Sequence, residues 1–341
     1  MVSLTTSADF SELHIAQDKA AEFYAVICLH QNGRGPALGG CRFIEYQSTN
    51  DAIQDAIRLS YAMSYKAAIS ELPHDGGKAV IVKPKQLKNR DLLLNRFAEF
   101  VDSLNGKYIT TVDSGTNATD MAVIKNKTSH VIGYLDNEEN NPSNSTALGV
   151  FRGIQAAVKL KHGSESLNGL HVAIQGIGSV GYRLARLLKD QGVRLTICDA
   201  RKEIAAHCAE EFDALWVNPD SIFDVKCDVF SPCALGRIIN EQTIQKLQTN
   251  IIAGAANDQL SSENLADELH KKDILFIPDY MINAGGLIHL SLEMQNKNKN
   301  DIDVAVNRIG SRILKLAEQA KDQNKTLYHA AKYSAEVIMK S

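Results

Sequence analysis

The feature that most constrains this chain is a glycine-rich turn between a predicted strand and a predicted helix. Residues 171–181 read HVAIQGIGSVG, so that an apolar run is followed by Gly176, Gly178 and Gly181. A second apolar run, residues 194–198, ends at Asp199, eighteen residues after the last of these glycines. Strand, glycine turn, helix, strand and acidic residue in this order form the fingerprint of a dinucleotide-binding unit. The sequence therefore predicts a parallel α/β sheet of the Rossmann type in this region.

Each position of the turn has a physical reason for its residue. Gly176 permits the tight turn, Gly178 lets backbone N–H groups approach a pyrophosphate, and Gly181 allows the helix to pack closely. Ser179 and Val180 begin the helix, and the N-terminus of a helix favours a bound phosphate. These five residues are the predicted cofactor-binding residues of the turn.

Asp199 predicts which dinucleotide binds. A carboxylate at this position accepts hydrogen bonds from the ribose hydroxyls and repels a 2′-phosphate, which favours NAD. Arg201 and Lys202 follow directly and could bind a 2′-phosphate, although solvated charges at a helix start are their commoner role. NADP therefore remains the minority alternative.

Strand-like and helix-like segments alternate along all 341 residues, which predicts an α/β chain of about two domains. The polar segment 136–144 is the strongest linker candidate. It predicts a first domain at residues 1–140 and a dinucleotide-binding domain at residues 141–326.

Charge and hydropathy exclude several functions. The chain has 37 Lys and Arg against 40 Asp and Glu, a net charge of −3, which argues against nucleic acid as a partner. No apolar run approaches the roughly 20 residues that span a membrane, and the N-terminus lacks the pattern of a secretory signal. The six cysteines form no CxxC pair and the ten histidines no HExxH motif. We therefore expect a cytoplasmic protein with free, buried thiols, no membrane partner and no metal.

The first half of the chain supplies candidate chemical groups. Lys66 and Lys78 lie twelve residues apart, and the glycine pair before Lys78 would let a backbone and an ammonium meet one small ligand. Asp113 follows the predicted strand 108–112, and a Gly/Pro-rich segment, residues 33–40, is predicted to be a loop. A lysine near a strand is usually a surface charge, so none of these residues is diagnostic by itself.

Together the motifs resemble the leucine/phenylalanine/valine branch of the amino-acid dehydrogenase family, and within it the leucine dehydrogenases most. The resemblance covers nearly the whole chain. Its motifs are residues 35–42, 63–66, 76–78, 113–116, 231–236, 252–257 and 278–286.

The resemblance implies an NAD-dependent, reversible oxidative deamination of a branched-chain L-amino acid, which yields a 2-oxo acid and ammonium. It also implies a cleft between two domains that opens and closes about residues 141–145, a last helix, 327–341, that packs back on the first domain, and a homo-oligomer, often an octamer. Two alternatives remain open. One is a preference for phenylalanine or tryptophan, and the other is a non-catalytic NAD-binding protein.

The resemblance also implies residue roles. Lys66, helped by the backbone at Gly39 and Gly40, binds the substrate carboxylate. Lys78 activates the attacking water, and Asp113 moves protons at the substrate nitrogen. A lysine is an effective base near neutral pH only if burial or a neighbouring cation lowers its pKa, and a second ammonium in a dry cleft would do this.

In the second half, the motifs place four residues near the cofactor: Cys233, Ala234, Asn257 and Asn283. The first three follow predicted strands, at the carboxyl ends where a doubly wound sheet binds its nucleotide. Each Asn is alternatively a structural residue of a turn or loop.

The departures from the family pattern cluster around the predicted site. Asp75 replaces the first of three glycines before Lys78, and Val112 and Ser114 flank Asp113 in place of Glu and Val. Leu38, Thr111 and Met281 are expected near the substrate side chain, and Thr111 and Met281 replace Ala and Val. Asp75 would raise the pKa of Lys78 if the two side chains touched. These changes leave the preferred amino acid open.

Overall fold

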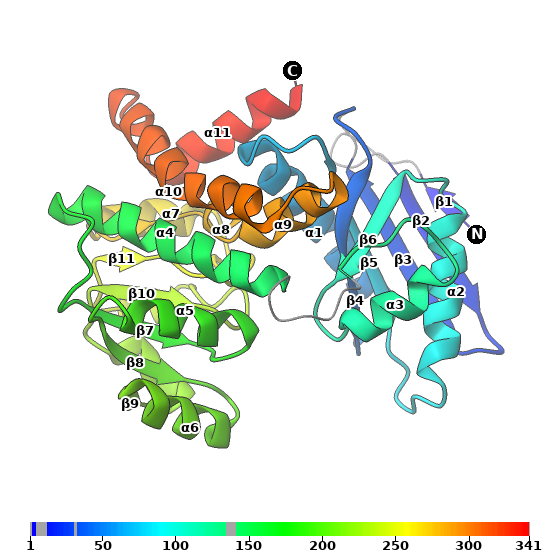
Figure 1. Ribbon diagram of the computed structural model, residues 1–341, viewed down its shortest axis with the longest axis horizontal. Coiled ribbons are helices and arrows are strands. Elements are labelled where there is room, and N and C mark those ends of the chain that lie inside the picture. The colour runs from blue at the N-terminus through cyan, green and yellow to red at the C-terminus, as the bar shows by residue number, and fades with distance from the viewer. Residues whose placement is uncertain (1, 5–11, 31–32, 134–140, 341) are drawn as a thin grey trace. The chain divides into compact units, whose positions relative to one another are not determined.

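The computed structural model describes residues 2–4, 12–30, 33–133 and 141–340 (Figure 1). The chain forms two compact units, and each is described here by itself. The first unit comprises Met1–Asn141 and Ala335–Ser341, and the second comprises Pro142–Ser334.

The predicted linker, residues 136–144, lies only partly in the described chain, because residues 136–140 fall outside it. The prediction is wrong for its last residues, since α4 (Pro142–His162) begins with them. Proline is compatible with the first turn of a helix, where its missing N–H would have had no intrahelical partner.

The first unit contains a six-stranded sheet in the order β1-β2-β3-β5-β4-β6. β4 runs parallel to β5 and β6, while the pairs β1–β2, β2–β3 and β3–β5 are antiparallel. The predicted strand 108–112 has the bounds of β6. The strands are β1 (Val2–Leu4), β2 (Glu12–Asp18), β3 (Phe23–His30), β4 (Ala37–Ile44), β5 (Asp75–Val82) and β6 (Tyr108–Val112).

Part of the segment predicted to be a loop, residues 33–40, is a strand. β4 begins at Ala37, so Gly39 and Gly40 are strand residues, and β5 includes the glycine pair before Lys78. β4 lies between β5 and β6 and its residues 37–41 are all buried. A strand covered on both faces loses the alternation of polar and apolar residues that usually reveals a strand in a sequence.

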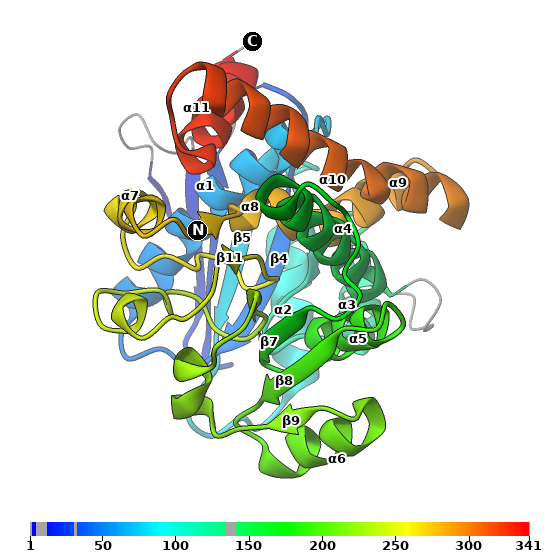
Figure 2. The same ribbon diagram turned by 90° about the vertical axis from the view of Figure 1, so that its left-hand side faces the viewer.

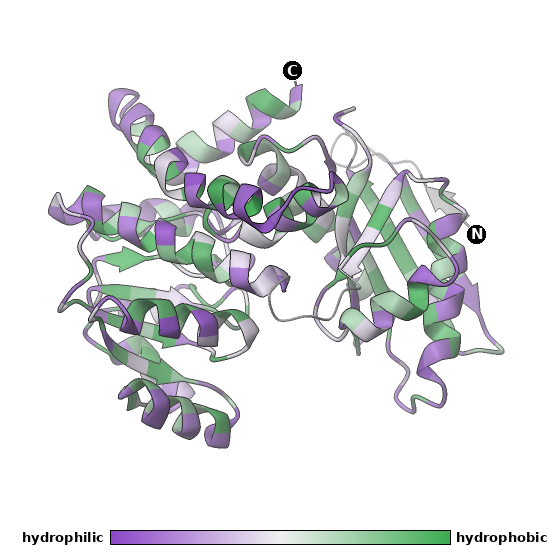
Figure 3. Cartoon of the chain, in the orientation of Figure 1, coloured by the Kyte–Doolittle hydropathy of each residue, from purple (hydrophilic) through white to green (hydrophobic). Residues whose placement is uncertain are grey.

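Helices cover both faces of this sheet. Val26, Cys28 and Val80 pack with Ala52 and Ala56 of α1 (Thr49–Ile69) in one cluster. The alternate strand residues, such as Ile27 and Ile81, pack with Leu94 and Phe97 of α2 (Arg90–Asp102) in another. Figure 1 shows α2 beside α3 (Ala118–Lys125), and Figure 3 shows that these strands are largely hydrophobic. Ser48 caps α1 by accepting a hydrogen bond from the Asp51 N–H.

The second unit contains a six-stranded sheet in the order β12-β11-β10-β7-β8-β9, and all its strand pairs are parallel. This is the strand order of a Rossmann fold, which confirms the predicted α/β class. β7 and β8 coincide with the two apolar runs that flank the glycine turn in the sequence. The strands are β7 (His171–Gln175), β8 (Arg194–Cys198), β9 (Leu215–Trp216), β10 (Val229–Pro232), β11 (Ile251–Ile252) and β12 (Leu275–Phe276).

Helices flank this sheet as well, and Figure 2 shows α6 next to the edge strand β9. The last helix, α11 (Leu327–Lys340), nearly has the bounds of the last helix, 327–341, that the family resemblance implies. No helix in the part of the chain described above is long and apolar enough to cross a membrane. The other helices of this unit are α5 (Ser179–Lys189), α6 (Lys202–Phe212), α7 (Asn264–Lys271), α8 (Asp279–Ile282), α9 (Gly285–Met294) and α10 (Lys299–Asp322).

The end of α11 belongs to the first unit, because residues from Ala335 onward are grouped with residues 1–141. The Tyr65 hydroxyl of α1 donates a hydrogen bond of 2.7 Å to Glu336 of α11. The chain thus returns to its first unit after the Rossmann sheet is complete.

Candidate active site

Several predicted residues of the first unit share the sheet face that α1 covers. Lys78 pairs directly with Cys28, which packs toward α1, and cross-strand partners share a face. Leu38 pairs with Gly76, two residues before Lys78, and Gly40 pairs with Thr111. Burial on one face of adjacent strands therefore brings together residues that lie far apart in the sequence.

Gly76 lets α1 approach this face closely. A Cβ atom at Gly76 would lie 2.2 Å from the Ser60 carbonyl oxygen, and the Gly76 N–H donates a hydrogen bond of 2.9 Å to the Ser64 hydroxyl. Lys66 lies in the last turn of the same helix and is 8% exposed. Gly76 thus sets the distance between α1, which carries Lys66, and β5, which carries Lys78.

Lys78 is 4% exposed, and its amine contacts Oδ2 of Asp113. Burial holds the pKa of Lys78 well below its ordinary value, and the positive charges of Arg42 and Lys66 lower it further. The Asp55 carboxylate opposes this shift, since a nearby negative charge favours the ammonium. The expected second ammonium, that of Lys66, thus lowers the pKa of Lys78, but the Arg42 guanidinium lowers it more.

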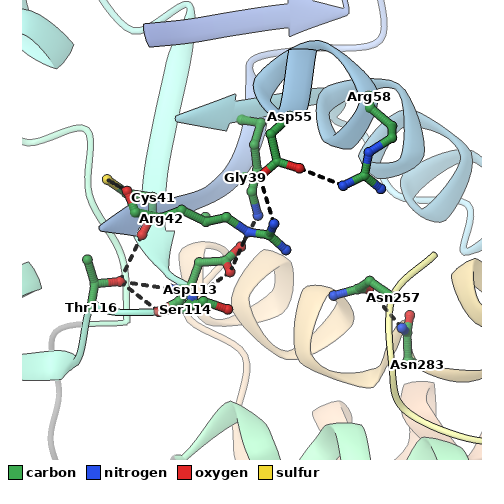
Figure 4. A network of polar contacts seen from close by, with 12 residues as sticks. Gly39, Cys41, Arg42, Asp55, Arg58, Asp113, Ser114, Thr116, Asn257 and Asn283 are labelled. Carbon is green, nitrogen blue, oxygen red and sulfur yellow. Dashed lines mark hydrogen bonds and ion pairs between the residues drawn. The ribbon is translucent and has the colours of Figure 1, made fainter. Parts of the chain in front are cut away.

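Asp113 follows β6, and backbone contacts fix its position (Figure 4). Its N–H donates a hydrogen bond of 2.9 Å to Thr116 Oγ1, and its Oδ1 accepts one of 2.5 Å from the Ser114 N–H. A Cβ atom at Gly40 would lie 2.7 Å from the Asp113 Cβ. A residue with a side chain at position 40 would therefore displace this carboxylate.

Arg42 and Asp55 are charged residues beside the site that were not among the predicted site residues. The Arg42 guanidinium lies 3.4 Å from Oδ1 of Asp113 through Nε and 2.8 Å from Asp55 through NH1. Arg42 stands at the end of the glycine-rich motif 35–42, but nothing in its spacing from Asp55 or Asp113 indicated that they meet. The contacts depend on β4, β6 and α1 being packed together.

Asp75 does not take part in this cluster. It alternates with Gly76 along β5 and so faces away from α1, and its Oδ2 accepts a hydrogen bond of 3.1 Å from the Gly33 N–H. The Asp75 and Lys78 side chains therefore do not touch among the described contacts, so the expected rise in the pKa of Lys78 does not apply. His74, the residue before Asp75, is buried, and burial lowers its pKa.

Leu38 and Thr111 are both buried, at 1% and 4% exposed. Thr111 Oγ1 has no hydrogen-bond partner among the described residues. A buried hydroxyl without a partner has lost its hydration without compensation, which costs roughly 1–3 kcal/mol. Such a group on the Lys78 face is available to a ligand.

In the second unit, the glycine turn between β7 and α5 packs against the end of β10. Gly176 has a φ of +95°, and a Cβ atom there would lie 2.6 Å from the Ala234 Cβ. The Cys233 N–H donates a hydrogen bond of 2.7 Å to the Gln175 carbonyl. A Cβ atom at Gly181 would lie 2.0 Å from the Gly176 carbonyl oxygen, whereas nothing lies within 4 Å of one at Gly178. The turn is thus tightly packed at Gly176 and Gly181, and it has open space at Gly178, where a phosphate would approach.

The start of α5 supports the interpretation that a phosphate would approach the turn at this point. Gly178 is its N-cap residue, and no side-chain hydrogen bond caps the helix in the described structure. The first N–H groups, including those of Ser179 and Val180, have no intrahelical acceptors. They are the donors that a pyrophosphate at a helix N-terminus would use.

Asp199 lies at the end of β8 and contacts the same turn. Its Oδ2 accepts a hydrogen bond of 3.0 Å from the Ile177 N–H, and its Oδ1 accepts one of 2.9 Å from Arg201 Nε. The hydrogen bond from Arg201 holds the pKa of Asp199 below its ordinary value. Since the Arg201 side chain is 57% exposed, it can leave this carboxylate without a large loss of packing.

Asn257 and Asn283 contact one another, as Figure 4 shows. The Asn283 side-chain amide donates hydrogen bonds of 2.8 Å to Asn257 Oδ1 and 3.0 Å to the Ala255 carbonyl. Its own Oδ1 is buried and has no partner within the described ranges. Met281 lies two residues earlier, on α8, and is 3% exposed. The structural role considered for each Asn is thus present, and one acceptor remains for a ligand.

Comparison with protein families gives two matches that cover most of the chain. The model for the Glu/Leu/Phe/Val dehydrogenase dimerisation domain matches residues 10–130. The model for glutamate/leucine/phenylalanine/valine dehydrogenase matches residues 197–339. The glycine turn, residues 176–181, lies between the two matches, so its assignment depends on its sequence and geometry.

Individual relatives agree with these matches. A leucine dehydrogenase of Thermoactinomyces intermedius is 42% identical over 96% of this chain and 90% of its own length. An L-tryptophan dehydrogenase of Nostoc punctiforme is 42% identical over 93% of this chain and 90% of its own length. The crystal structure of the L-tryptophan dehydrogenase from that organism superposes with a TM-score of 0.80 and covers 97% of this chain and 96% of its own. The chain belongs to the glutamate/leucine/phenylalanine/valine dehydrogenase family.

Proposed function

We propose that this protein is an NAD-dependent L-amino-acid dehydrogenase that oxidatively deaminates a branched-chain amino acid (leucine, valine or isoleucine) to its 2-oxo acid and ammonium, reversibly. The observation that carries the proposal is the buried Lys78 amine in contact with Asp113, on a sheet face shared with Thr111 and Leu38. A lysine with a lowered pKa beside a carboxylate is a base and a proton carrier in one cluster.

We assign the following roles in the first unit. Lys66 binds the substrate carboxylate as an ammonium, helped by the backbone at Gly39 and Gly40. Lys78, as a neutral amine, removes a proton from the water that attacks the substrate carbon. Asp113 passes protons to and from the substrate nitrogen. The low pKa of Lys78 supports its assignment as base, because a larger neutral fraction exists near neutral pH.

We assign dinucleotide binding to the turn of the second unit. The N–H groups of Ser179, Val180 and Gly181 would hold the pyrophosphate above the open position at Gly178, and Asp199 would bind the ribose hydroxyls. Cys233 and Ala234 pack against the turn, and Asn257 and Asn283 offer amide groups to the nicotinamide ribose or the substrate. When bound, NAD accepts the hydride from the substrate carbon. Asp199 favours NAD over NADP, while Arg201 beside it keeps NADP as the alternative.

The aromatic amino acids are a second candidate substrate class. The L-tryptophan dehydrogenase relative is as similar in identity as the leucine dehydrogenase relative, at 42% each. Thr111 and Met281, expected near the substrate side chain, depart from the Ala and Val of the leucine-type pattern.

A panel of L-amino acids with NAD⁺ and with NADP⁺ tests the proposal. We expect NADH formation at alkaline pH with leucine, valine or isoleucine, and little activity with NADP⁺. Preference for phenylalanine or tryptophan would replace the branched-chain assignment with the aromatic one. NADH binding by fluorescence without turnover on any amino acid would support the third alternative, a non-catalytic NAD-binding protein, and contradict the proposal.

Thr111→Val is expected to increase kcat/KM for leucine about three- to tenfold and to stabilise the fold by roughly 1 kcal/mol, because it removes a buried hydroxyl without a partner. The measurements are steady-state kinetics on the panel and thermal unfolding. Thr110→Val is the matched control, since Thr110 is the adjacent residue of β6 and points to the opposite face. An unchanged substrate preference in Thr111→Val would remove this residue from the pocket.

We further propose that residues 1–140 carry substrate binding, that residues 141–326 carry the dinucleotide, and that the enzyme is a cytoplasmic homo-oligomer, with the octamer suggested by the family resemblance. The description of the model that matches residues 10–130 as a dimerisation domain supports an oligomer. Five of the six cysteines are buried and all six are free, which fits a reducing compartment.

A further inference from the structure

Arg42 lies between two carboxylates on the α1 side of the first unit (Figure 4). Its Nε is 3.4 Å from Oδ1 of Asp113, and its NH1 is 2.8 Å from Oδ2 of Asp55. The Lys78 amine contacts the other oxygen of Asp113, Oδ2. Two cations therefore bind the two oxygens of one carboxylate, and one of them, the guanidinium, never loses its charge in the working pH range.

Asp55 is held firmly enough to fix Arg42. Its Oδ2 accepts a hydrogen bond of 2.7 Å from the Tyr46 hydroxyl, and its Oδ1 accepts one of 2.5 Å from Arg58. Burial alone would raise the pKa of Asp55, but Arg42, Tyr46 and Arg58 outweigh it and keep the pKa below its ordinary value. The Asp55 side chain is 14% exposed and the Arg42 side chain 18%. An ionised, largely buried anchor on α1 thus sets the position of a guanidinium on β4.

We propose that Arg42, anchored by Asp55, is a positioning residue that turns Oδ2 of Asp113 toward Lys78 and places a permanent positive charge beside the Lys78 amine. The inference deepens the proposed function and rests on it for its catalytic meaning. The effect of Arg42 on the charge state of Lys78 involves only described residues of the first unit, and it can be measured without turnover.

The charged and titratable groups around Lys78 come from several elements. β4 contributes Arg42 and Cys41, α1 contributes Lys66 and Asp55, and Asp113 follows β6. β3 contributes Cys28, the cross-strand partner of Lys78. Burial raises the pKa of Cys28 to about 11 and raises that of Cys41 further, so both thiols are neutral at working pH. The charges that act on Lys78 are therefore two cations and two carboxylates.

The sign of the effect follows from these charges. A cation near an ammonium destabilises it, so Arg42 lowers the pKa of Lys78 and increases the fraction of neutral amine at a given pH. Removing the Arg42 charge raises the pKa of Lys78, and the pH at which the base becomes active moves upward. A purely structural role would reduce activity at every pH without shifting the pH at which kcat/KM rises.

The test compares Arg42→Gln, which loses the charge but keeps hydrogen-bond donors, with Arg42→Lys, which keeps the charge but loses the planar fork. The pKa of Lys78 is measured by labelling with acetic anhydride over a pH series, followed by mass spectrometry of the peptide that contains Lys78. The pH profile of kcat/KM is measured in parallel on the best amino acid of the panel. Circular dichroism checks that each variant is folded.

We expect Arg42→Gln to raise the labelling pKa of Lys78 and the kcat/KM limb by about one pH unit, and to lower kcat at least about tenfold with a much smaller change in KM. Arg42→Lys should leave the pKa near its wild-type value while kcat still falls. Arg96→Met is the matched control, because Arg96 is an arginine of the same unit that is 45% exposed and pairs with Asp18 and Glu99 rather than with Asp55 or Asp113. This control variant should change neither the labelling pKa of Lys78 nor kcat appreciably.

An unchanged Lys78 pKa in folded Arg42→Gln overturns the inference, as does an equal shift in Arg96→Met. If Arg42→Gln does not fold, Arg42→Lys carries the test alone, and wild-type kcat in that variant refutes positioning. A labelling shift in an enzyme that turns over no amino acid would sustain the electrostatic inference while the proposed function fails, so the two failures are distinguishable.

Discussion

Lys78→Met is expected to reduce kcat for amino-acid oxidation by about 10³-fold or more while leaving the fold and NADH binding intact. The amine is the proposed base, and no other described lysine contacts Asp113. Methionine fills most of the volume of the lysine stem, so the site, which exposes only 4% of Lys78, is not emptied. Arg42 remains beside Asp113, so the variant does not leave an isolated carboxylate. The measurements are NADH formation from the preferred amino acid and NADH binding by fluorescence.

Lys83→Met is the matched control for this variant. Lys83 directly follows β5, the strand that carries Lys78, but its side chain is 39% exposed and pairs with Glu45 at 3.5 Å. Surface ion pairs of this kind contribute little, so we expect wild-type activity. If Lys78→Met retained more than about a tenth of wild-type kcat, general-base catalysis by Lys78 would be ruled out, because such groups contribute about 10²–10⁴-fold.

The second large effect concerns two glycines of the same turn, which should respond differently to alanine. Gly178→Ala is expected to leave the thermal stability nearly unchanged and to weaken NADH binding at least about tenfold, a loss of about 1.4 kcal/mol. Gly178 has an extended backbone, with φ −82°, and no described atom lies within 4 Å of an added Cβ. The added methyl group would therefore meet only the cofactor.

Gly181→Ala should lose both stability and NADH binding. The added Cβ would lie 2.0 Å from the Gly176 carbonyl oxygen, which is backbone and cannot move without opening the turn. Overpacking of this kind costs about 1–3 kcal/mol. Thermal unfolding and NADH titration of the two variants separate the effects. Equal NADH affinity in Gly178→Ala and wild type would contradict pyrophosphate binding at this turn.

Much of the second unit could be predicted, because its signals are local. β7, the glycine turn, α5 and β8 are consecutive, and each has its own apolar run or glycine spacing. The first unit was harder. β4 begins inside the segment where glycines predicted a loop, since a central strand buried on both faces shows no alternation. Burial of this kind depends on partners that arrive from elsewhere in the chain.

The same limit applies to the candidate site. Lys66, Lys78 and Asp113 could be named from their motifs, and Gly76 from its place beside Lys78. Arg42 and Asp55 could not, because the contacts between them and with Asp113 join residues 13 and 71 positions apart. Asp75 illustrates the converse: it is close to Lys78 in sequence, yet strand alternation turns it to the opposite face.

The sequence by itself determined the class of fold and the glycine turn, because these depend on residue type and short-range spacing, and the candidate catalytic groups could be named through the family resemblance of its motifs. Only the tertiary structure decided which charges surround Lys78. The free energy of a buried ammonium depends on distances to charges and on access to water, and these arise when β4, β5, β6 and α1 pack together. The pKa of Lys78 is therefore a property of the folded unit, whereas the glycine turn is already specified by its own few residues.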